Sequence, residues 1–141
     1  MAAKRLSDTP DKRADVDLRC PTRITDPKSG ATYTKDLLPD AVFGLEYRAP
    51  AGSRFRFFAV EADRATEPVI SGNVRRKSFE RQLLQYEAYV EGGGYRRHLN
   101  LTAPLLVLNV TTSAARLECY LKMTAMRFST GNSYQLFQVS A

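Results

Sequence analysis

The chain has 141 residues, enough for one domain that buries a sizeable core without needing disulfides or metals to hold it together. Hydrophobic residues make up 43% and charged residues 26%, values close to globular averages, which exclude a generally disordered chain. The net charge of +6 is typical of proteins that meet a phosphate-bearing partner.

Cysteine and histidine content restricts the possible chemistry. Cys20 and Cys119 belong to no CxxC pair or Cys/His cluster, so a zinc site is excluded by spacing, and we expect free thiols in a reducing compartment. His98 is the single histidine, which argues against Ser-His-Asp and Cys-His enzymes. The polar N-terminus and the lack of an apolar run near ~20 residues predict a cytoplasmic protein with no membrane span.

Patterning is weak in the first part of the chain. Residues 1–14 mix Lys, Arg, Asp and Pro without periodicity, so we expect a flexible arm of basic and acidic residues. We expect a single domain over residues 15–141. Apolar and charged residues alternate over 16–20, which indicates one short strand. The Pro- and Gly-containing segment 26–30 predicts a turn.

A β-hairpin is predicted next. Apolar residues alternate over 41–47, as in a strand with one buried face, and residues 55–60 form a second run of strand-favouring residues. Residues 49–53, Ala-Pro-Ala-Gly-Ser, read as the turn between them. So short a connection implies that the two strands are antiparallel.

The second half of the chain alternates helices and strands. Four apolar residues at helical spacing predict a helix over 74–90, which Gly92-Gly93-Gly94 ends. The apolar run 105–110 predicts a strand covered on both faces. Ser113 is a favourable N-cap for a second helix, and residues 134–139 are expected to form a final strand. We expect this second helix to be continued by Leu117, Leu121, Thr124 and Phe128.

This order of elements predicts an α/β fold with a mixed central sheet. The hairpin supplies two antiparallel strands. A helical crossover of right-handed sense should return the third strand parallel to its neighbour. Helices would then flank the sheet.

Acidic residues stand at the ends of the two hairpin strands. Asp40 begins the first strand, and Glu61 and Asp63 end the second, two residues apart and therefore on one face. Antiparallel pairing brings these ends together, and Mg²⁺ is commonly held by one or two carboxylates with water and substrate phosphate. The alternative is that the carboxylates cap turns or pair with Arg48 or Arg64.

Three strings in this region resemble the plasmid replication-relaxation family, which itself resembles the PD-(D/E)xK nuclease superfamily. They are Leu38-Pro39-Asp40-Ala41, Glu61-Ala62-Asp63-Arg64-Ala65-Thr66-Glu67 and Gln82-Leu83-Leu84-Gln85-Tyr86. The similarity spans about residues 37–128 in the right order, and Arg116 also fits the family's layout.

The resemblance implies a restriction-endonuclease-like ββαβα core that uses Mg²⁺ or Mn²⁺ to cut DNA of plasmids or other mobile elements. It implies Asp40, Glu61 and Asp63 as metal ligands. Gln82 and Tyr86 would match a Gln-x-x-x-Tyr motif on the helix that supports the site and contacts DNA.

The chain departs from the superfamily in one informative place. A lysine usually stands two residues after the second acid, where it stabilises developing charge. Here that position is Asp63, and Lys77 is the candidate substitute. Two hypotheses therefore stay open. The domain is either a metal-dependent deoxyribonuclease or a catalytically inactive module of the same fold that binds DNA or a protein partner.

Two basic clusters flank the first predicted helix and are candidate DNA contacts. The first contains Arg75, Arg76 and Arg81, and the second contains Arg96 and Arg97. The alternative for both is an ordinary solvated surface.

Overall fold

The protein forms two sheets and a set of helices in the computed structural model, which describes residues 17–63, 69, 74–75, 77–131 and 134–140 and the backbone of residues 2–5. The strands are β1 (Ala2–Arg5), β2 (Cys20–Thr25), β3 (Thr32–Leu37), β4 (Ala41–Ala49), β5 (Gly52–Asp63), β6 (Leu105–Thr111) and β7 (Gln135–Val139). The helices are α1 (Phe79–Tyr86), the π-helix η2 (Glu87–Glu91), α2 (Gly94–Leu99) and α3 (Ala114–Arg127).

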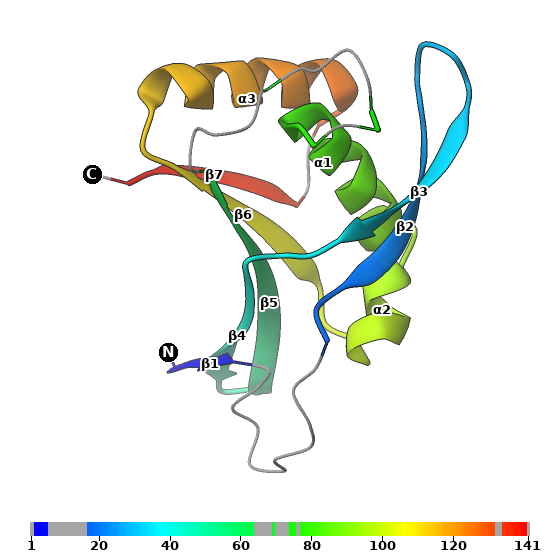
Figure 1. The fold of residues 1–141 in the computed structure, drawn as a ribbon. Coiled ribbons are helices and arrows are strands. Elements are labelled where there is room, and N and C mark those ends of the chain that lie inside the picture. The colour runs from blue at the N-terminus through cyan, green and yellow to red at the C-terminus, as the bar shows by residue number, and fades with distance from the viewer. Residues whose placement is uncertain are drawn as a thin grey trace.

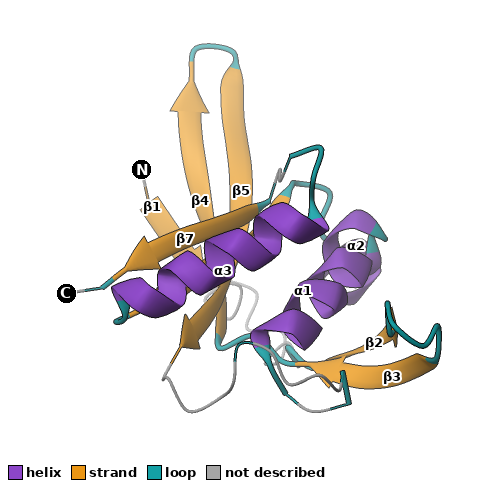
Figure 2. Cartoon of the chain, turned by 90° about the horizontal axis from the view of Figure 1, so that it is seen from above, coloured by secondary structure: helices purple, strands orange, loops and turns teal. Residues whose placement is uncertain are grey.

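The main sheet has five strands in the order β1-β4-β5-β6-β7 and is mixed (Figure 1). The predicted hairpin is confirmed: β4 and β5 pair antiparallel from Ala41↔Val60 to Ala49↔Gly52. Its free end extends beyond the other strands (Figure 2). The turn is shorter than expected, because the ladder continues until only Pro50 and Ala51 connect the strands.

Strands β6 and β7 continue the sheet in parallel, as the alternation of helices and strands predicted. Glu61 of β5 lies opposite Asn109 of β6, and Asn109 lies opposite Phe137 of β7. Both crossovers proceed in the same direction across the sheet, so the right-handed rule places their helices on the same face. Burial agrees, because Leu105 and Val107 are buried whereas the intervening Leu106 is only half-buried.

The core lies between this face and the helices. Ala59 of β5 and Val107 of β6 meet Tyr86 and Tyr89, all of them almost fully buried. A second apolar cluster joins α1, α3 and β7, with the rings of Phe79 and Tyr120 4.2 Å apart. Tyr86 is therefore a core residue.

The first helix is shorter than predicted. Val74 is buried in a turn, and α1 begins at Phe79 after Ser78, whose hydroxyl accepts the Arg81 N–H at 3.1 Å. The helix then widens into η2, which ends at Gly92 as expected. The sequence prediction missed α2, which starts at Gly94 after Gly93 takes a left-handed conformation with φ of 76°.

The second helix begins where it was predicted, with Ser113 as its N-cap. The face that it buries is narrow. Tyr120 and Thr124 are buried, whereas Leu121 is 47% exposed. Leu121 belongs to the helix as predicted but lies outside the stripe of α3 that is buried.

The N-terminal region contains a hairpin that the sequence predicted only in part. The turn at 26–30 is confirmed by hydrogen bonds between Asp26 and both Gly30 and Ala31. The expected strand at 16–20 is displaced to Cys20–Thr25, and it pairs with β3, which was not predicted. The hairpin packs against α1 and projects beyond it (Figure 1).

The expected flexible arm at 1–14 has one structured part. Residues 2–5 form β1, which pairs antiparallel with β4 along the edge of the main sheet. This corrects the prediction for those four residues. The remainder of the arm, together with Arg64, Arg76 and most of the segment 64–73, lies outside the described residues.

Candidate functional site

A cavity of about 650 Å³ opens where the end of β5 meets the start of α1. Most of the residues predicted as a catalytic site line it: Asp40, Glu61, Asp63, Lys77 and Gln82. The remaining one, Tyr86, lies behind the wall and reaches Glu61. Described residues of all three strings that carried the family resemblance thus meet at one place, although Asp40 and Tyr86 lie 46 residues apart in sequence.

Asp40 reaches the end of β5 across the hairpin. The Asp40 N–H donates to the Val60 carbonyl at 3.0 Å, which continues the β4–β5 ladder by one residue. Its carboxylate Oδ2 accepts the Ala62 N–H at 2.8 Å. Asp40 therefore stands beside Glu61, as predicted, with its side chain exposed at the mouth of the cavity.

Glu61 is held from behind by Tyr86. The Tyr86 hydroxyl donates to Glu61 Oε1 at 2.5 Å, a short charge-assisted bond. Burial of the ring, followed by the nearby negative charge of Glu61, raises the pKa of Tyr86 well above its usual value. Tyr86 consequently stays protonated and keeps donating, which fixes the direction of the Glu61 carboxylate.

Asp63 is engaged by a cation on α3. Arg116 donates from Nε to Oδ2 at 2.7 Å and from its second terminal nitrogen to Oδ1 at 3.1 Å, a bidentate pair. The Thr111 hydroxyl also donates to Oδ2 at 2.8 Å. The hydrogen bond to Asp63 raises the pKa of Arg116, which stays charged. A guanidinium therefore stands beside the position where the superfamily usually has lysine.

Gln82 begins a chain of side-chain amides that crosses the sheet. Its Nε2 donates to Asn109 Oδ1 at 2.9 Å, and Asn109 Nδ2 donates to Gln135 Oε1 at 2.8 Å and to the Leu136 carbonyl at 3.1 Å. Asn109 is 4% exposed. The chain fixes the position of Gln82 on the wall of the cavity.

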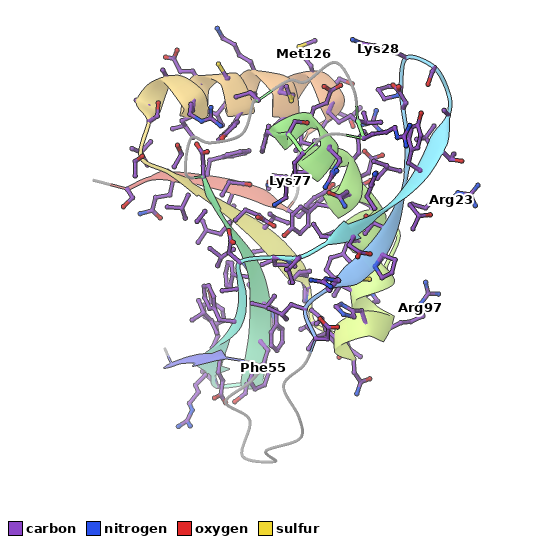
Figure 3. The ribbon with its side chains drawn as sticks, in the orientation of Figure 1. Arg23, Lys28, Phe55, Lys77, Arg97 and Met126 are labelled. Carbon is purple, nitrogen blue, oxygen red and sulfur yellow. The ribbon has the colours of Figure 1, made fainter. Side chains whose placement is uncertain are left out.

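The first basic cluster adjoins the cavity. Lys77 and Arg81 line it at the start of α1, and Figure 3 shows Lys77 near the middle of the molecule. Arg81 is held by the Arg75 carbonyl at 3.0 Å and by Gln85 Oε1 at 3.3 Å. Arg75 is exposed and lies over the Tyr33 ring, 5.5 Å from its centroid.

The second basic cluster lies elsewhere. Arg96 and Arg97 belong to α2 and do not line the cavity. Arg96 donates to the Thr102 carbonyl at 2.9 Å and covers the Tyr95 ring. Arg97 points outward, far from Lys77 (Figure 3). The two predicted basic clusters therefore lie apart, and only the first adjoins the cavity.

The donor set suits a hard cation only in part. Within the described residues, no group of three or more His, Cys, Asp or Glu side chains comes together in a way that could hold a metal. Asp40 and Glu61 are neighbours, but Asp63 is turned to Arg116. Mg²⁺ needs only one or two carboxylates in addition to water and phosphate oxygens, so Asp40 and Glu61 fit it.

Both ring nitrogens of His98 make hydrogen bonds within the fold. A carbonyl only accepts, so Nε2 donates to the Asp17 carbonyl at 2.7 Å, and Nδ1 accepts from the Tyr89 hydroxyl at 2.7 Å. These bonds join α2 to the segment before β2. Cys20 and Cys119 are both free thiols, in agreement with the prediction from their spacing.

Sequence reasoning missed several residues that shape the cavity. Asn109 was read as part of an apolar strand, yet it is a lone amide at an inward position of the alternation Leu105, Val107, Asn109. A polar residue at an inward position of an apolar strand was a signal in the sequence that Asn109 has a polar partner in the interior. Asp36 and Tyr120 also line the cavity. Nothing in their local sequence marks them, because β3 and α3 bring them there.

Comparison of the chain with models of known protein families, with curated proteins and with solved structures gives no match. The family resemblance therefore rests on the quoted strings alone. Within the described part of the chain, no helix is long and apolar enough to cross a membrane.

Proposed function

We propose that the protein is a metal-dependent deoxyribonuclease-like domain that acts on DNA at the cavity between β5 and α1. The observation that carries the proposal is the side-by-side placement of Asp40 and Glu61 across the hairpin at the cavity mouth. Lys77 and Arg81 line the same cavity from the start of α1. Carboxylates for a cation and basic groups for phosphate thus share one cavity.

The arrangement of elements supports the same proposal. An antiparallel hairpin that carries the acids is followed by a helix and by a strand parallel to the second hairpin strand. This is the ββαβα order of a restriction-endonuclease-like core. We assign the finer fold on this ground, together with plasmid or mobile-element DNA as the substrate that the family resemblance implies.

Asp40 and Glu61 would hold Mg²⁺ or Mn²⁺, which would supply polarisation of the scissile phosphate and activation of water. Tyr86 orients Glu61 through its hydroxyl. Arg116 is kept cationic beside Asp63 and lines the cavity, so it takes the electrostatic place of the missing lysine. Asp63 then serves to position Arg116 rather than to bind metal.

A second candidate function is a non-catalytic module that binds DNA or a protein partner. The observation in its favour is the bidentate Asp63–Arg116 pair. This pair neutralises one of the three expected ligands, and with two carboxylates remaining the cation is held less strongly. In this reading the cavity binds phosphate through its basic wall and does not cleave it.

Supercoiled plasmid incubated with the protein and Mg²⁺ or Mn²⁺ tests the proposal. We expect nicking that falls by about a hundredfold or more in both Asp40→Asn and Glu61→Gln, because each removes a ligand charge without changing side-chain size. Asp36→Asn is the matched control, since Asp36 lines the same cavity and is exposed. Its activity should stay within about threefold of the unmodified protein.

Calorimetric titration with Mg²⁺ separates the two candidates. Metal binding that disappears in Glu61→Gln supports the nuclease. Retained DNA binding without cleavage or metal binding by the unmodified protein would refute catalysis and support the binding module. Nicking that persists in Asp40→Asn and Glu61→Gln would show that the assigned residues are wrong.

A further inference from the structure

Asn109 is a polar residue at an inward position of β6, where Leu105 and Val107 are buried and apolar. Its side chain is 4% exposed. Burying an amide costs free energy unless its polar groups are paired, and an apolar residue at the same place would avoid that cost. The amide of Asn109 therefore points to a role other than packing.

The backbone carbonyl of Leu136 determines which way the Asn109 amide faces. A carbonyl oxygen only accepts hydrogen bonds, so the Asn109 atom that lies 3.1 Å from it is the nitrogen. The Asn109 oxygen then faces Gln82. That oxygen needs a donor, so Gln82 turns its Nε2 toward it, at 2.9 Å. The backbone of β7 thereby sets the orientation of an amide on α1.

The same orientation turns the oxygen of Gln82 away from Asn109. Gln82 is half-buried and lines the cavity. Within the described part of the chain, no donor reaches its Oε1, and this oxygen is not one of the polar atoms enclosed in the interior without a partner. Gln82 Oε1 is therefore a hydrogen-bond acceptor open to the cavity.

This acceptor lies beside Glu61. In the sheet, Glu61 of β5 is directly opposite Asn109 of β6, and both side chains point to α1. Tyr86 and Gln82, one turn apart on that helix, hold them in place. The Gln82 oxygen thus shares one wall of the cavity with a carboxylate that the proposed function assigns to the site.

We propose that Gln82 Oε1 orients the water that attacks the phosphodiester, and that Asn109 is the positioning residue that keeps this oxygen turned to the cavity. The inference rests on the proposed deoxyribonuclease function. The water oxygen forms a bond to phosphorus, and the bond from phosphorus to the leaving sugar oxygen breaks. The water gives one proton to solvent, and the leaving oxygen takes one from solvent. Gln82 takes no proton and only accepts a hydrogen bond, which directs a lone pair of the water at phosphorus.

An amide turned the other way would not serve this purpose. Its nitrogen donates and does not accept, so it would engage the lone pair of the water that is needed for attack. The two orientations of a glutamine amide have nearly the same shape, so packing does not select between them. The hydrogen bond to Asn109 makes the selection.

Steady-state nicking of supercoiled plasmid with Mg²⁺ tests the role of each residue. We expect Gln82→Met and Asn109→Leu each to lower kcat by about tenfold or more and to leave KM within about threefold. Thr124→Val is the matched control, because Thr124 is also buried, and its hydroxyl donates to the Tyr120 carbonyl at 2.7 Å. It too replaces a hydrogen-bonding side chain by an apolar one, and its kcat should stay within about threefold.

A double variant shows whether Asn109 acts through Gln82. Once Gln82→Met has removed the acceptor, Asn109→Leu should lower kcat no further. If the two losses multiply instead, Asn109 does not act through Gln82 and the positioning role is wrong. Urea denaturation checks that all the variants fold.

The orientation of the Gln82 amide has a readout that needs no catalysis. In nuclear magnetic resonance spectra, a Gln82 Nε2 proton should exchange with solvent at least about tenfold more slowly than those of the exposed Gln138, because it is bound to Asn109. Equally fast exchange at both glutamines would refute the orientation, whether or not Asn109→Leu folds.

The outcomes separate this inference from the proposed function. If the unmodified protein nicks no DNA, the proposed function is wrong and the role of Gln82 is lost with it. If the unmodified protein nicks DNA and Gln82→Met retains its kcat, only the present inference is overturned.

Discussion

At the residue scale, Asp63 was expected to be a metal ligand, but its carboxylate pairs with Arg116 instead. Its carboxylate receives two hydrogen bonds from Arg116 and one from Thr111. The side chains of Asp63 and Arg116 retain 12% and 22% exposure, so neither charge is well solvated. Each charge is therefore compensated mainly by the other, so the removal of one partner should leave the other charge poorly solvated and lower the stability of the fold.

A double-mutant cycle on this pair gives the first prediction. We expect Asp63→Asn and Arg116→Met to show a coupling of about 1–2 kcal/mol in the free energy of unfolding, between values for exposed and buried pairs. Arg116→Met alone should cost more than the double variant, because it leaves the Asp63 charge half-buried. Urea denaturation measures all four proteins. Additive effects would show that the pair contributes nothing as a pair.

At the scale of elements, the start of α1 positions one wall of the cavity. The Ser78 hydroxyl accepts the Arg81 N–H and so satisfies one of the unpaired donors in the first turn. Lys77 directly precedes this cap, and Gln82 follows on the first turns of the helix. The cap therefore determines where the helix that carries Arg81 and Gln82 into the cavity wall begins.

Removing this cap gives the second prediction. Ser78→Ala should lower the free energy of unfolding by about 1 kcal/mol, and Ser113→Ala at the start of α3 should have a similar effect. Ser53→Ala, at an exposed position in the hairpin, is the control and should stay within about 0.5 kcal/mol of the unmodified protein. Hydrogen exchange should speed up in α1 for Ser78→Ala only. Equal hydrogen-exchange rates in α1 for both N-cap variants would contradict the assignment of Ser78 as the N-cap of α1.

At the scale of the whole molecule, buried tyrosines tie stability to pH. Burial raises the pKa of Tyr86, Tyr89 and Tyr134 above the usual value, and it raises the pKa of Tyr120 to about 12. The folded protein thus favours the neutral phenols, whereas the unfolded chain ionises near pH 10. This contribution to stability is complete below about pH 10 and is lost as pH rises through the folded-state values.

The third prediction follows from these raised tyrosine pKa values. The free energy of unfolding should fall steadily above about pH 10, and tyrosinate absorbance should rise together with the loss of secondary structure. Tyr120→Phe should reduce the slope, because it removes one of the groups concerned. A stability that stays constant between about pH 9 and 11.5 would be inconsistent with buried, neutral tyrosines.

Local pattern predicted much of the fold because its signals are short-range. The alternation over 41–47 and the strand-favouring run at 55–60 predicted the hairpin, the apolar run at 105–110 predicted a buried strand, and Ser113 predicted the start of α3. The errors occurred where signals were weak. Residues 32–37, Thr-Tyr-Thr-Lys-Asp-Leu, lack an apolar alternation, and β3 forms there because its partner β2 and helix α1 cover one side.

The sequence indicated which residues lie together at the candidate site, but not which of their side chains form hydrogen bonds and ion pairs. Sequence alone determined which acids stand at the hairpin ends, because strand period and antiparallel pairing fix Asp40 beside Glu61. Only the tertiary structure decided that Asp63 pairs with Arg116, that Asn109 holds Gln82, and that Leu121 is exposed. Those outcomes depend on which face of α3 meets the sheet and on contacts between residues more than 25 apart in sequence, which no local pattern encodes.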